Sequence, residues 1–320
     1  MKNFWEKLSL PIVGLSPMDG VTDAPMRFIA KKYGKADIIY TEFVSAEGLW
    51  RIEKRGEMEN KIWQDLRFDN TQGPNIVQLF GSDPESFYES AKIICRLGFD
   101  GIDINMGCPS PGLEKRGGGA GLIRDKCNAV EVVEATRRGS GNLPVSVKTR
   151  IGSDKPDEEW WKTLAGMNLP AVAMHGRTFK QLYSGEADWD VLRQAAEVIR
   201  ESGTLFLGNG DIKKYEDFKK NEVCMDGVLI GRAAIGNPWV LRRDGYVPSV
   251  EEKLSVAVEH ARKFEEMLPE QKFFVMRKHL VGYASGFPEA VELRKKLVMT
   301  NSADEVERVV GEWLGEREKN

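Results

Sequence analysis

The segment Gly101-Ile-Asp-Ile-Asn-Met-Gly-Cys-Pro109 decides the fold, because a short apolar run ends there abruptly in Asn, Cys and Pro. Such runs are typical of buried strands. Seven further runs occur along the chain, separated by longer amphipathic stretches. The eight runs cover residues 12–15, 38–40, 75–80, 101–104, 145–147, 171–174, 204–207 and 227–230. Eight alternations of strand and helix predict an α/β fold that closes into a (β/α)8 TIM barrel.

Polar residues follow nearly every expected strand, and a barrel would bring them together at one face. Lys148 and Arg150 lie two residues apart on one strand, as His175 and Arg177 do at the next strand end. Because strand side chains alternate in direction, each pair should point into the same mouth. A doubly wound open sheet is the alternative, but it would gather reactive residues at one switch point.

The chain changes character after the last expected strand. Gly245 and Pro248 predict a linker over residues 242–250. Beyond it, apolar residues recur at helical spacing, namely Leu254, Val258, Ala261, Phe264 and Leu268. Ser302-Ala-Asp-Glu305 predicts a capping box at the start of a later helix. We therefore expect a barrel domain over residues 1–241 and a small all-helical domain over residues 251–320.

The composition is that of an ordinary globular protein, with 320 residues and a net charge of -3. No global positive charge indicates a nucleic-acid partner, although a local patch would suffice. Glu6 and Lys7 interrupt the start of the chain, which therefore does not resemble a signal peptide. No apolar run approaches the roughly 20 residues that a membrane span needs. The four cysteines lack metal-ligand spacing, so we expect a reduced, cytoplasmic protein without a metal site.

Two glycine-containing loops follow the seventh and eighth expected strands, Gly208-Asn-Gly-Asp211 and Gly231-Arg232. Loops at these places often bind phosphate, because glycines let backbone N–H groups approach an anion closely. Each loop alone is explained by a tight turn, but two on adjacent strands favour a phosphate-bearing cofactor. Gly117-Gly-Gly-Ala-Gly121 lacks the context of a dinucleotide fingerprint, and we expect it to form a mobile lid beside Cys108.

Three further side chains carry chemistry. Lys148 lies within an apolar strand, so an anionic or electronegative group should face it. His175 is one of three histidines, and its place at a strand end favours a functional role. Cys108 admits two roles, a thiolate nucleophile with His175 as its base or a neutral thiol that acts as an acid. The residues alone leave both roles open.

Collectively the motifs resemble those of the tRNA-dihydrouridine synthases, most closely the bacterial branch. The matching motifs, in the order of that family, are Pro17-Met-Asp-Gly-Val-Thr-Asp23 with Arg27, Val77-Gln-Leu-Phe-Gly81, Asn105-Met-Gly-Cys-Pro109, Lys148-Thr-Arg150, His175-Gly-Arg-Thr178, Gln181-x-Tyr-x-Gly185, Asn209-Gly-Asp211 and Gly231-Arg232. The resemblance runs from about residue 11 to 240 and continues more weakly through Arg277-Lys-His279 and Gly286-Phe287. The set is specific, although no single motif is.

The resemblance implies an FMN-binding barrel that reduces the C5–C6 bond of selected uridines in tRNA, with NADPH or NADH as the reductant. It implies hydride transfer from the flavin to uracil C6 and protonation of C5 by Cys108, which suits a neutral thiol. The cofactor-binding residues that it implies are Pro17, Met18, Gln78, Lys148, His175, Asn209, Gly210, Asp211, Gly231 and Arg232. The target base is expected to contact Asn105 and Arg177, and the tRNA is expected to contact Arg277 and Lys278.

Local charge is consistent with an RNA partner. Residues 261–300 carry eight basic and five acidic side chains, so this region is +3 within a chain of net charge -3. A phosphate-contacting surface needs such an excess, although a solvated charged face is the simpler explanation of the count. The target uridine would have to leave its stack to reach a barrel mouth.

Three other functions are weighed against this one. A small-molecule FMN reductase of the dihydroorotate dehydrogenase type would not need the helical domain with its basic centre. A non-catalytic RNA-binding protein would not need the full set of site residues. A cysteine-nucleophile hydrolase would leave the two phosphate loops unexplained. No obligate protein partner is implied.

Overall fold

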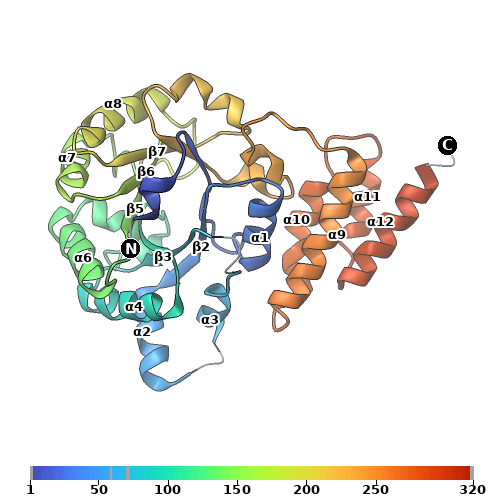
Figure 1. Ribbon diagram of the computed structural model, residues 1–320, viewed down its shortest axis with the longest axis horizontal. Helices are drawn as coiled ribbons and strands as arrows, with labels where there is room; N and C mark the ends of the chain where they lie inside the picture. The colour runs from blue at the N-terminus through green and yellow to red at the C-terminus, as the bar shows by residue number, and fades with distance from the viewer. Residues whose placement is uncertain (1–2, 58–59, 70–72, 318–320) are drawn as a thin grey trace.

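Eight parallel strands close into a barrel in the computed structural model, which describes residues 3–57, 60–69 and 73–317 (Figure 1). The strands follow one another around the barrel in chain order, and β1 pairs with β8 to close it. They are β1 (Ile12–Leu15), β2 (Ile38–Ser45), β3 (Asn75–Phe80), β4 (Gly101–Met106), β5 (Val145–Arg150), β6 (Ala171–His175), β7 (Leu205–Asn209) and β8 (Gly227–Ile230). The predicted TIM barrel is confirmed.

Helices surround the barrel, and local sequence explains where many of them begin. The helices are α1 (Ala24–Lys32), α2 (Ala46–Arg55), α3 (Lys61–Asp65), α4 (Pro84–Leu97), α6 (Lys126–Gly139), α7 (Glu158–Gly166) and α8 (Trp189–Arg200), with the short α5 (Pro111–Glu114) after β4. Five of them start at an aspartate whose carboxylate accepts a backbone N–H of the first turn, as N-caps do: Asp23, Asp83, Asp125, Asp157 and Asp188.

The core has two layers, as alternation along the strands requires. One set of side chains, including Ile12, Tyr40 and Leu229, fills the barrel interior together with Trp5 from the N-terminal 3₁₀ helix η1 (Phe4–Lys7). The opposite faces of the strands pack against the surrounding helices. The interior is therefore solid, and space for a ligand lies at the ends of the strands.

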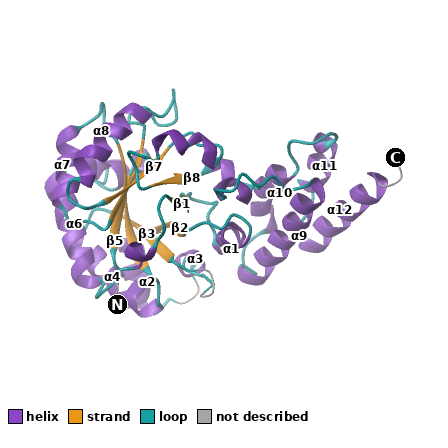
Figure 2. Cartoon of the chain, turned by 45° about the horizontal axis from the view of Figure 1, so that its top comes forward, coloured by secondary structure: helices purple, strands orange, loops and turns teal. Residues whose placement is uncertain are grey.

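A bundle of helices follows the barrel and lies at its side (Figures 1 and 2). It consists of α9 (Val250–Met267), the 3₁₀ helix η8 (Phe273–Met276), α10 (Arg277–Tyr283), α11 (Ala290–Leu297) and α12 (Ala303–Arg317). Its core contains Leu254, Ala261, Phe264 and Leu268, as the helical spacing predicts, and Val258 packs at its edge. Ile29 of α1 belongs to the same core, so the bundle is packed against the barrel.

The expected capping box at α12 is half formed. The Ser302 hydroxyl accepts the backbone N–H of Glu305, as predicted. The Glu305 carboxylate, however, accepts the N–H of Asn301 rather than that of Ser302. The side chain therefore satisfies a backbone donor one residue earlier than the motif specifies.

Two contacts to backbone atoms of the barrel loops join the bundle to the barrel. A Cβ added to Gly282 of α10 would lie 2.2 Å from the carbonyl oxygen of Ile235 and 2.9 Å from the Cα of Gly236, so the two segments cross closely only because glycine is present. On the same helix, the Lys278 ammonium donates to the carbonyl oxygen of Gly20. The bundle is thus held by the loops that follow β1 and β8.

Candidate functional site

A pocket of about 1500 Å³ opens at the carboxyl ends of the strands, where barrels carry their sites. Thirteen of the predicted site residues line it: Pro17, Met18, Gln78, Asn105, Cys108, Lys148, His175, Arg177, Asn209, Gly210, Asp211, Gly231 and Arg232. Arg277 and Lys278 lie outside it, on α10 of the bundle. The structure therefore brings together the residues that the sequence assigned to cofactor, base and catalysis, and separates the two assigned to tRNA.

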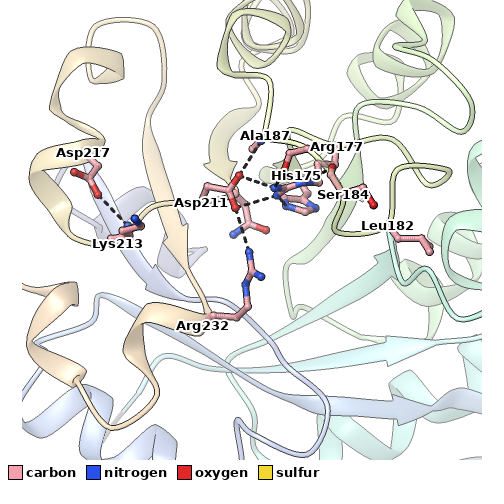
Figure 3. Close-up of polar contacts among 12 residues, drawn as sticks. His175, Arg177, Leu182, Ser184, Ala187, Asp211, Lys213, Asp217 and Arg232 are labelled. Atoms are coloured by element: carbon pink, nitrogen blue, oxygen red, sulfur yellow. Dashed lines mark hydrogen bonds and ion pairs between the residues drawn. The ribbon is translucent and has the colours of Figure 1, made fainter. Parts of the chain in front are cut away.

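One end of the pocket is formed by the loops after β7 and β8. Gly210 has a φ of +125°, and a Cβ there would lie 2.6 Å from the Cβ of Ala187 and 2.9 Å from the His175 ring. Asp211 follows it, and its carboxylate accepts hydrogen bonds from Arg177, Arg232 and the backbone of Ala187 (Figure 3). Burial works to raise the pKa of Asp211, but the hydrogen bonds from Arg177 and Ala187 outweigh it and the pKa is lowered. The carboxylate is therefore ionised and holds Arg232 at the rim.

Arg177 is buried and fully engaged within the protein. Its five N–H groups reach Asp211 twice, the carbonyl oxygens of Ser184 and Gly185, and the Nε2 atom of His175 at 3.4 Å. A guanidinium has five donors in all. This arrangement favours a positioning role, in which Arg177 fixes the loop after β6, over the predicted contact with the target base.

Lys148 and Asn209 form the floor of the same region. The Lys148 ammonium donates to the Asn209 side-chain oxygen at 3.1 Å, and the Asn209 amide donates to the carbonyl oxygen of Leu229 at 2.8 Å. Burial, together with the neighbouring charge of Arg150, lowers the pKa of Lys148 to about 8. The Lys148 ammonium can therefore still bind a negatively charged group of a ligand, as the sequence predicts.

His175 is a neutral imidazole in this environment. Burial is the first cause that lowers its pKa far below the ordinary value, and the charges of Lys148, Arg150, Arg177 and Arg232 act in the same direction. A neutral ring can donate one hydrogen bond and accept another, but it cannot serve as a strong acid at neutral pH. No described contact joins it to Cys108, so the geometry does not supply the base that a thiolate nucleophile would need.

Cys108 lies at the opposite side of the mouth, immediately after β4. The Asn105 side-chain oxygen accepts the backbone N–H groups of Gly107 and Cys108 at 3.0 and 2.8 Å. Burial raises the pKa of the thiol above its ordinary value, and the N–H of Ser110 opposes this only in part. The protonated thiol is therefore the form present at neutral pH, which favours the acid over the nucleophile.

Asn105 was expected to contact a target base, and most of its hydrogen-bonding capacity is used inside the protein. Besides the two backbone donors, its amide nitrogen donates to the Gln78 side-chain oxygen at 2.9 Å. One N–H of Asn105 remains for a ligand, because an amide nitrogen carries two hydrogens. The residue thus shapes the Cys108 loop in addition to lining the pocket.

The glycine-rich segment beside Cys108 is not an open lid. Residues 119–123 form the buried 3₁₀ helix η3 (Gly119–Ile123), and the backbone N–H of Ala120 donates to the carbonyl oxygen of Cys108 at 3.2 Å. A Cβ at Gly119 would lie 3.0 Å from that same oxygen. The prediction of a mobile lid is therefore wrong for residues 119–121. Their glycines instead let the segment pack against the backbone of Cys108.

Three residues of the site were missed or left unassigned by the sequence reasoning. Asp103 is buried inside the barrel two residues before Asn105, and the alternation of the strand could have pointed to it. Arg150 donates to the carbonyl oxygen of Gly107 and lies 6.0 Å from the ring centre of Tyr183. Tyr183 also lies 5.6 Å from the Arg232 guanidinium, and its exposed ring stands at the mouth.

Several basic side chains lie on η8, α10 and α11 of the bundle or next to these helices. Within the described residues, the cations of this region that form no ion pair are Lys272, Arg277, Lys278, Arg294 and Lys296. The other three basic residues of the region are paired with acids, so the count of charges overstates the free positive charge. The unpaired set lies on and between η8, α10 and α11.

Other classes of site find no support in the part of the chain that the structure describes. No cluster of three or more His, Cys, Asp or Glu side chains is arranged to hold a metal ion. Over the same residues, no helix combines the length and the apolar character that crossing a membrane requires.

Comparison with known proteins matches these features to one family. The model of the family described as "Dihydrouridine synthase (Dus)" matches residues 14–314. A protein of Staphylococcus aureus (strain MRSA252) named "Probable tRNA-dihydrouridine synthase" is 30% identical, over 100% of this chain and 98% of its own. "Probable tRNA-dihydrouridine synthase 2" of Bacillus subtilis (strain 168) is 30% identical, over 98% of this chain and 97% of its own.

The solved structures that resemble this chain share less sequence identity with it than these relatives do. A structure of morphinone reductase in complex with tetrahydroNAD covers 76% of this chain and 89% of its own, with a TM-score of 0.49 and 16% identity. This likeness adds nothing to the family match.

Proposed function

Because the chain belongs to the dihydrouridine synthase family, we propose that it reduces the C5–C6 bond of uridines in tRNA with a flavin cofactor. The cofactor that we propose is FMN, with NADPH or NADH as the reductant, in a cytoplasmic protein. The observation that carries the proposal is a pocket at the strand ends that is lined together by a thiol, a buried lysine and two glycine loops. We further propose residues 1–241 as the flavin-binding domain and residues 251–320 as the tRNA-binding domain.

The chemistry of the pocket fits a flavin mononucleotide. Gly210 and Gly231 line the pocket, and glycines leave backbone N–H groups open to close contact with a phosphate. Arg232 stands at that end, and the Asp211 carboxylate orients it rather than binding phosphate, since two anions would repel. Gly231, Met18 and Pro17 line the adjoining wall.

The ring end of the cofactor would meet Lys148, Gln78 and His175. A bound flavin supplies hydride chemistry, accepting hydride from a nicotinamide and delivering it to an electron-poor carbon. Lys148 would contribute a positive charge that stabilises an electron-rich ring, and its desolvated position makes that charge effective. His175, held neutral, can donate or accept a hydrogen bond without adding a charge.

Cys108 would act as the acid. A thiol whose pKa is raised by burial keeps its proton until negative charge develops on the substrate, and then delivers it from Sγ to uracil C5. Asn105 and Arg150 hold the loop that carries the thiol through hydrogen bonds to Cys108 and Gly107. The thiol position is therefore set by side chains from the ends of β4 and β5, which bind the backbone of its loop.

The RNA would be held by the free cations of the bundle. Lys272, Arg277, Arg294 and Lys296 would contact phosphates, although Arg277 also donates to Asn301 and Arg294 to the carbonyl oxygen of Ala284. Lys278 donates to the carbonyl oxygen of Gly20 and would serve the RNA from the domain junction. The target uridine would leave its stack to enter the barrel mouth.

An absorbance spectrum of the purified protein, followed by anaerobic addition of NADPH and then unmodified tRNA, tests this function. We expect flavin bands that bleach with NADPH and return with tRNA. Bands that return with orotate or a free pyrimidine base, but not with tRNA, would instead indicate a small-molecule reductase. A colourless protein that takes up no added FMN would overturn the proposal.

A further inference from the structure

Four strands present one row of side chains to the barrel interior at the floor of the pocket, and Phe43 and Gln78 of this row line the pocket itself. Phe43 of β2 pairs in register with Gln78 of β3, Gln78 with Asp103 of β4, and Asp103 with Ser146 of β5. A carboxylate without access to water is costly unless each oxygen finds a donor. Asp103 is fully buried, and no role for it follows from the sequence reasoning above.

Both oxygens of Asp103 accept hydrogen bonds from this row. The Ser146 hydroxyl donates to Oδ1 at 2.6 Å, and the Gln78 amide nitrogen donates to Oδ2 at 2.7 Å. An ionised carboxylate only accepts hydrogen bonds, so it dictates which end of the Gln78 amide faces it. The Gln78 nitrogen must turn toward Asp103, and the Gln78 oxygen must turn toward Asn105.

The order of donors and acceptors that Asp103 requires extends along the hydrogen bonds to the loop that carries Cys108. The Gln78 oxygen accepts the Asn105 amide nitrogen, and the Asn105 oxygen accepts the backbone N–H groups of Gly107 and Cys108. Backbone N–H groups only donate, so the Asn105 oxygen must face Gly107 and Cys108 and the Asn105 nitrogen must face Gln78. This orientation agrees with the one that Asp103 requires of Gln78. Acceptor and donor therefore alternate without conflict from Asp103 to Cys108.

We propose that Asp103 is a positioning residue that sets the direction of this line of hydrogen bonds and so holds the Cys108 loop at the pocket. A second consequence concerns the ligand. Gln78 and Asn105 each keep one N–H that no group among the described residues accepts, and both side chains line the pocket. With the direction fixed, both amides offer donors, which suits carbonyl oxygens on a pyrimidine-type ring rather than ring N–H groups.

Electrostatics agrees with the geometry. Burial raises the pKa of Asp103 to about 6, and the hydrogen bonds from Ser146 and Gln78 and the charge of Lys148 oppose that rise. The carboxylate is accordingly ionised at neutral pH. The inference about donors rests on the proposed function, but the inference about the loop does not, because the line of hydrogen bonds is present without any ligand.

The test uses Asp103→Leu, which keeps the size and removes both acceptors, and Asp103→Asn, which keeps one acceptor oxygen. The matched control is Ser146→Ala, which removes the other hydrogen bond to Asp103 and leaves Gln78 untouched. The first readout is the rate at which iodoacetamide alkylates Cys108 in the flavin-free protein, followed by mass spectrometry. Cys95 and Cys127 are exposed and serve as internal references.

We expect alkylation of Cys108 to rise about threefold or more in Asp103→Leu, because the loop loses its anchor, with Cys95 and Cys127 unchanged. Asp103→Asn and Ser146→Ala should stay near the wild-type rate. With tRNA as substrate, kcat of Asp103→Leu should fall about tenfold or more while KM stays constant, and Asp103→Asn should recover most of kcat.

An unchanged alkylation rate of Cys108 in Asp103→Leu would overturn the inference, and so would an equal rise at all three cysteines. If Asp103→Leu does not fold, Gln78→Met interrupts the same line one residue further along, and the same selective rise is expected. Because alkylation needs neither tRNA nor NADPH, failure of the proposed function would leave this outcome readable.

Discussion

The guanidinium of Arg177 forms a bidentate ion pair with the carboxylate of Asp211, with N–O distances of 3.0 and 2.7 Å, although the two residues lie after different strands. Arg232 contacts the same carboxylate at 3.1 Å from the solvent side. The Arg177 side chain is 3% exposed and that of Arg232 is 64% exposed. One carboxylate therefore binds a buried arginine and an exposed one, and we propose that only the exposed one contacts the cofactor.

Replacing the two arginines should separate stability from binding. Arg177→Met leaves buried partners unpaired and should lower the free energy of unfolding by about 3 kcal/mol. Arg232→Met breaks an exposed pair and should cost less than about 1 kcal/mol, while weakening flavin binding. Urea denaturation of the flavin-free protein and a fluorescence titration with FMN measure the two effects. Equal losses of stability in both variants would contradict this division.

Loss of the thiol should affect only the half-reaction with RNA. Cys108→Ala removes the acid, so anaerobic reduction of the flavin by NADPH should proceed as before. Reoxidation by tRNA should slow by about 10²–10⁴-fold, the range for loss of a general acid. Stopped-flow absorbance follows both steps, with Cys127→Ala on the exposed face of α6 as the control. A variant that reoxidises with tRNA at the wild-type rate would remove Cys108 from the mechanism.

Lys148 should make flavin binding depend on pH. Its pKa in the ligand-free protein is lowered to about 8, so the side chain is a cation below that pH and neutral above it. If the cation stabilises the bound flavin, Kd for FMN should rise above pH 8 by up to about tenfold per unit. Fluorescence titrations between pH 7 and pH 10 measure this in wild type and in Lys148→Met, where the slope should vanish.

The control for that titration is Lys162→Met on α7, whose ammonium pairs with Glu158 at the surface. This variant should keep the wild-type slope. A slope that persists in Lys148→Met would assign the titration to another group.

A buried acidic cluster should make the protein less stable as pH rises. Glu42, in the middle of β2, lies near Asp23 and Asp65, with Arg27 and Lys61 as the nearby cations. Burial, followed by the charges of Asp65 and Asp23, raises the pKa of Glu42 to about 7 from 4.5. A carboxyl with a raised pKa contributes stability that is complete below pH 4.5 and is lost as pH rises through about 7.

The corresponding variant is Glu42→Gln, which stays neutral at every pH. Its free energy of unfolding should exceed that of wild type at pH 8 by about 2 kcal/mol, and the two should converge near pH 5. Urea denaturation at the two pH values measures this. Glu131→Gln on the exposed face of α6 should follow the wild type throughout. A wild-type protein whose stability increases from pH 5 to pH 8 would refute the argument unless other groups were shown to titrate more strongly.

Two glycine-to-alanine changes should act in opposite directions. Gly282→Ala places a Cβ 2.2 Å from the carbonyl oxygen of Ile235, so the bundle must shift and the melting temperature should fall. Gly311 lies in α12 with nothing within 4 Å of the added Cβ, so Gly311→Ala should raise stability by about 0.5–1 kcal/mol. Calorimetry compares the two. Equal effects would mean that the crossing with Gly236 is not tight in solution.

The sequence predicted where the strands lie better than where they end. Residues 145–147 were expected as a strand, and β5 continues to Arg150. The apolar run stops at Lys148, where side chains begin to face the pocket, but backbone pairing with β6 continues through Arg150. The change from apolar to polar residues at Lys148 therefore shows where side chains begin to line the pocket, and it does not show where the strand ends.

Membership of the site was predictable, whereas the direction of its contacts was not. Alternation along a barrel strand predicts which polar residues at its end face the mouth, and Lys148 and His175 do line the pocket. The partner of Asp103 is Gln78, 25 residues away, and this pairing depends on the register between strands. The attachment of Lys278 to Gly20 depends likewise on how the bundle docks, which no local pattern encodes.

If the bundle binds tRNA as proposed above, the crossing of Gly236 and Gly282 bears on which nucleotide is modified. Gly236 lies just beyond the pocket wall, and Gly282 lies on the helix that begins with Arg277. Because backbone touches backbone there, the span from the basic helices to the barrel mouth has a constant length. An RNA bound to those helices would place in the barrel mouth only the uridine that lies at this fixed distance from the bound segment. The target uridine would then be selected by its distance from the bound RNA segment rather than by contacts to the neighbouring bases.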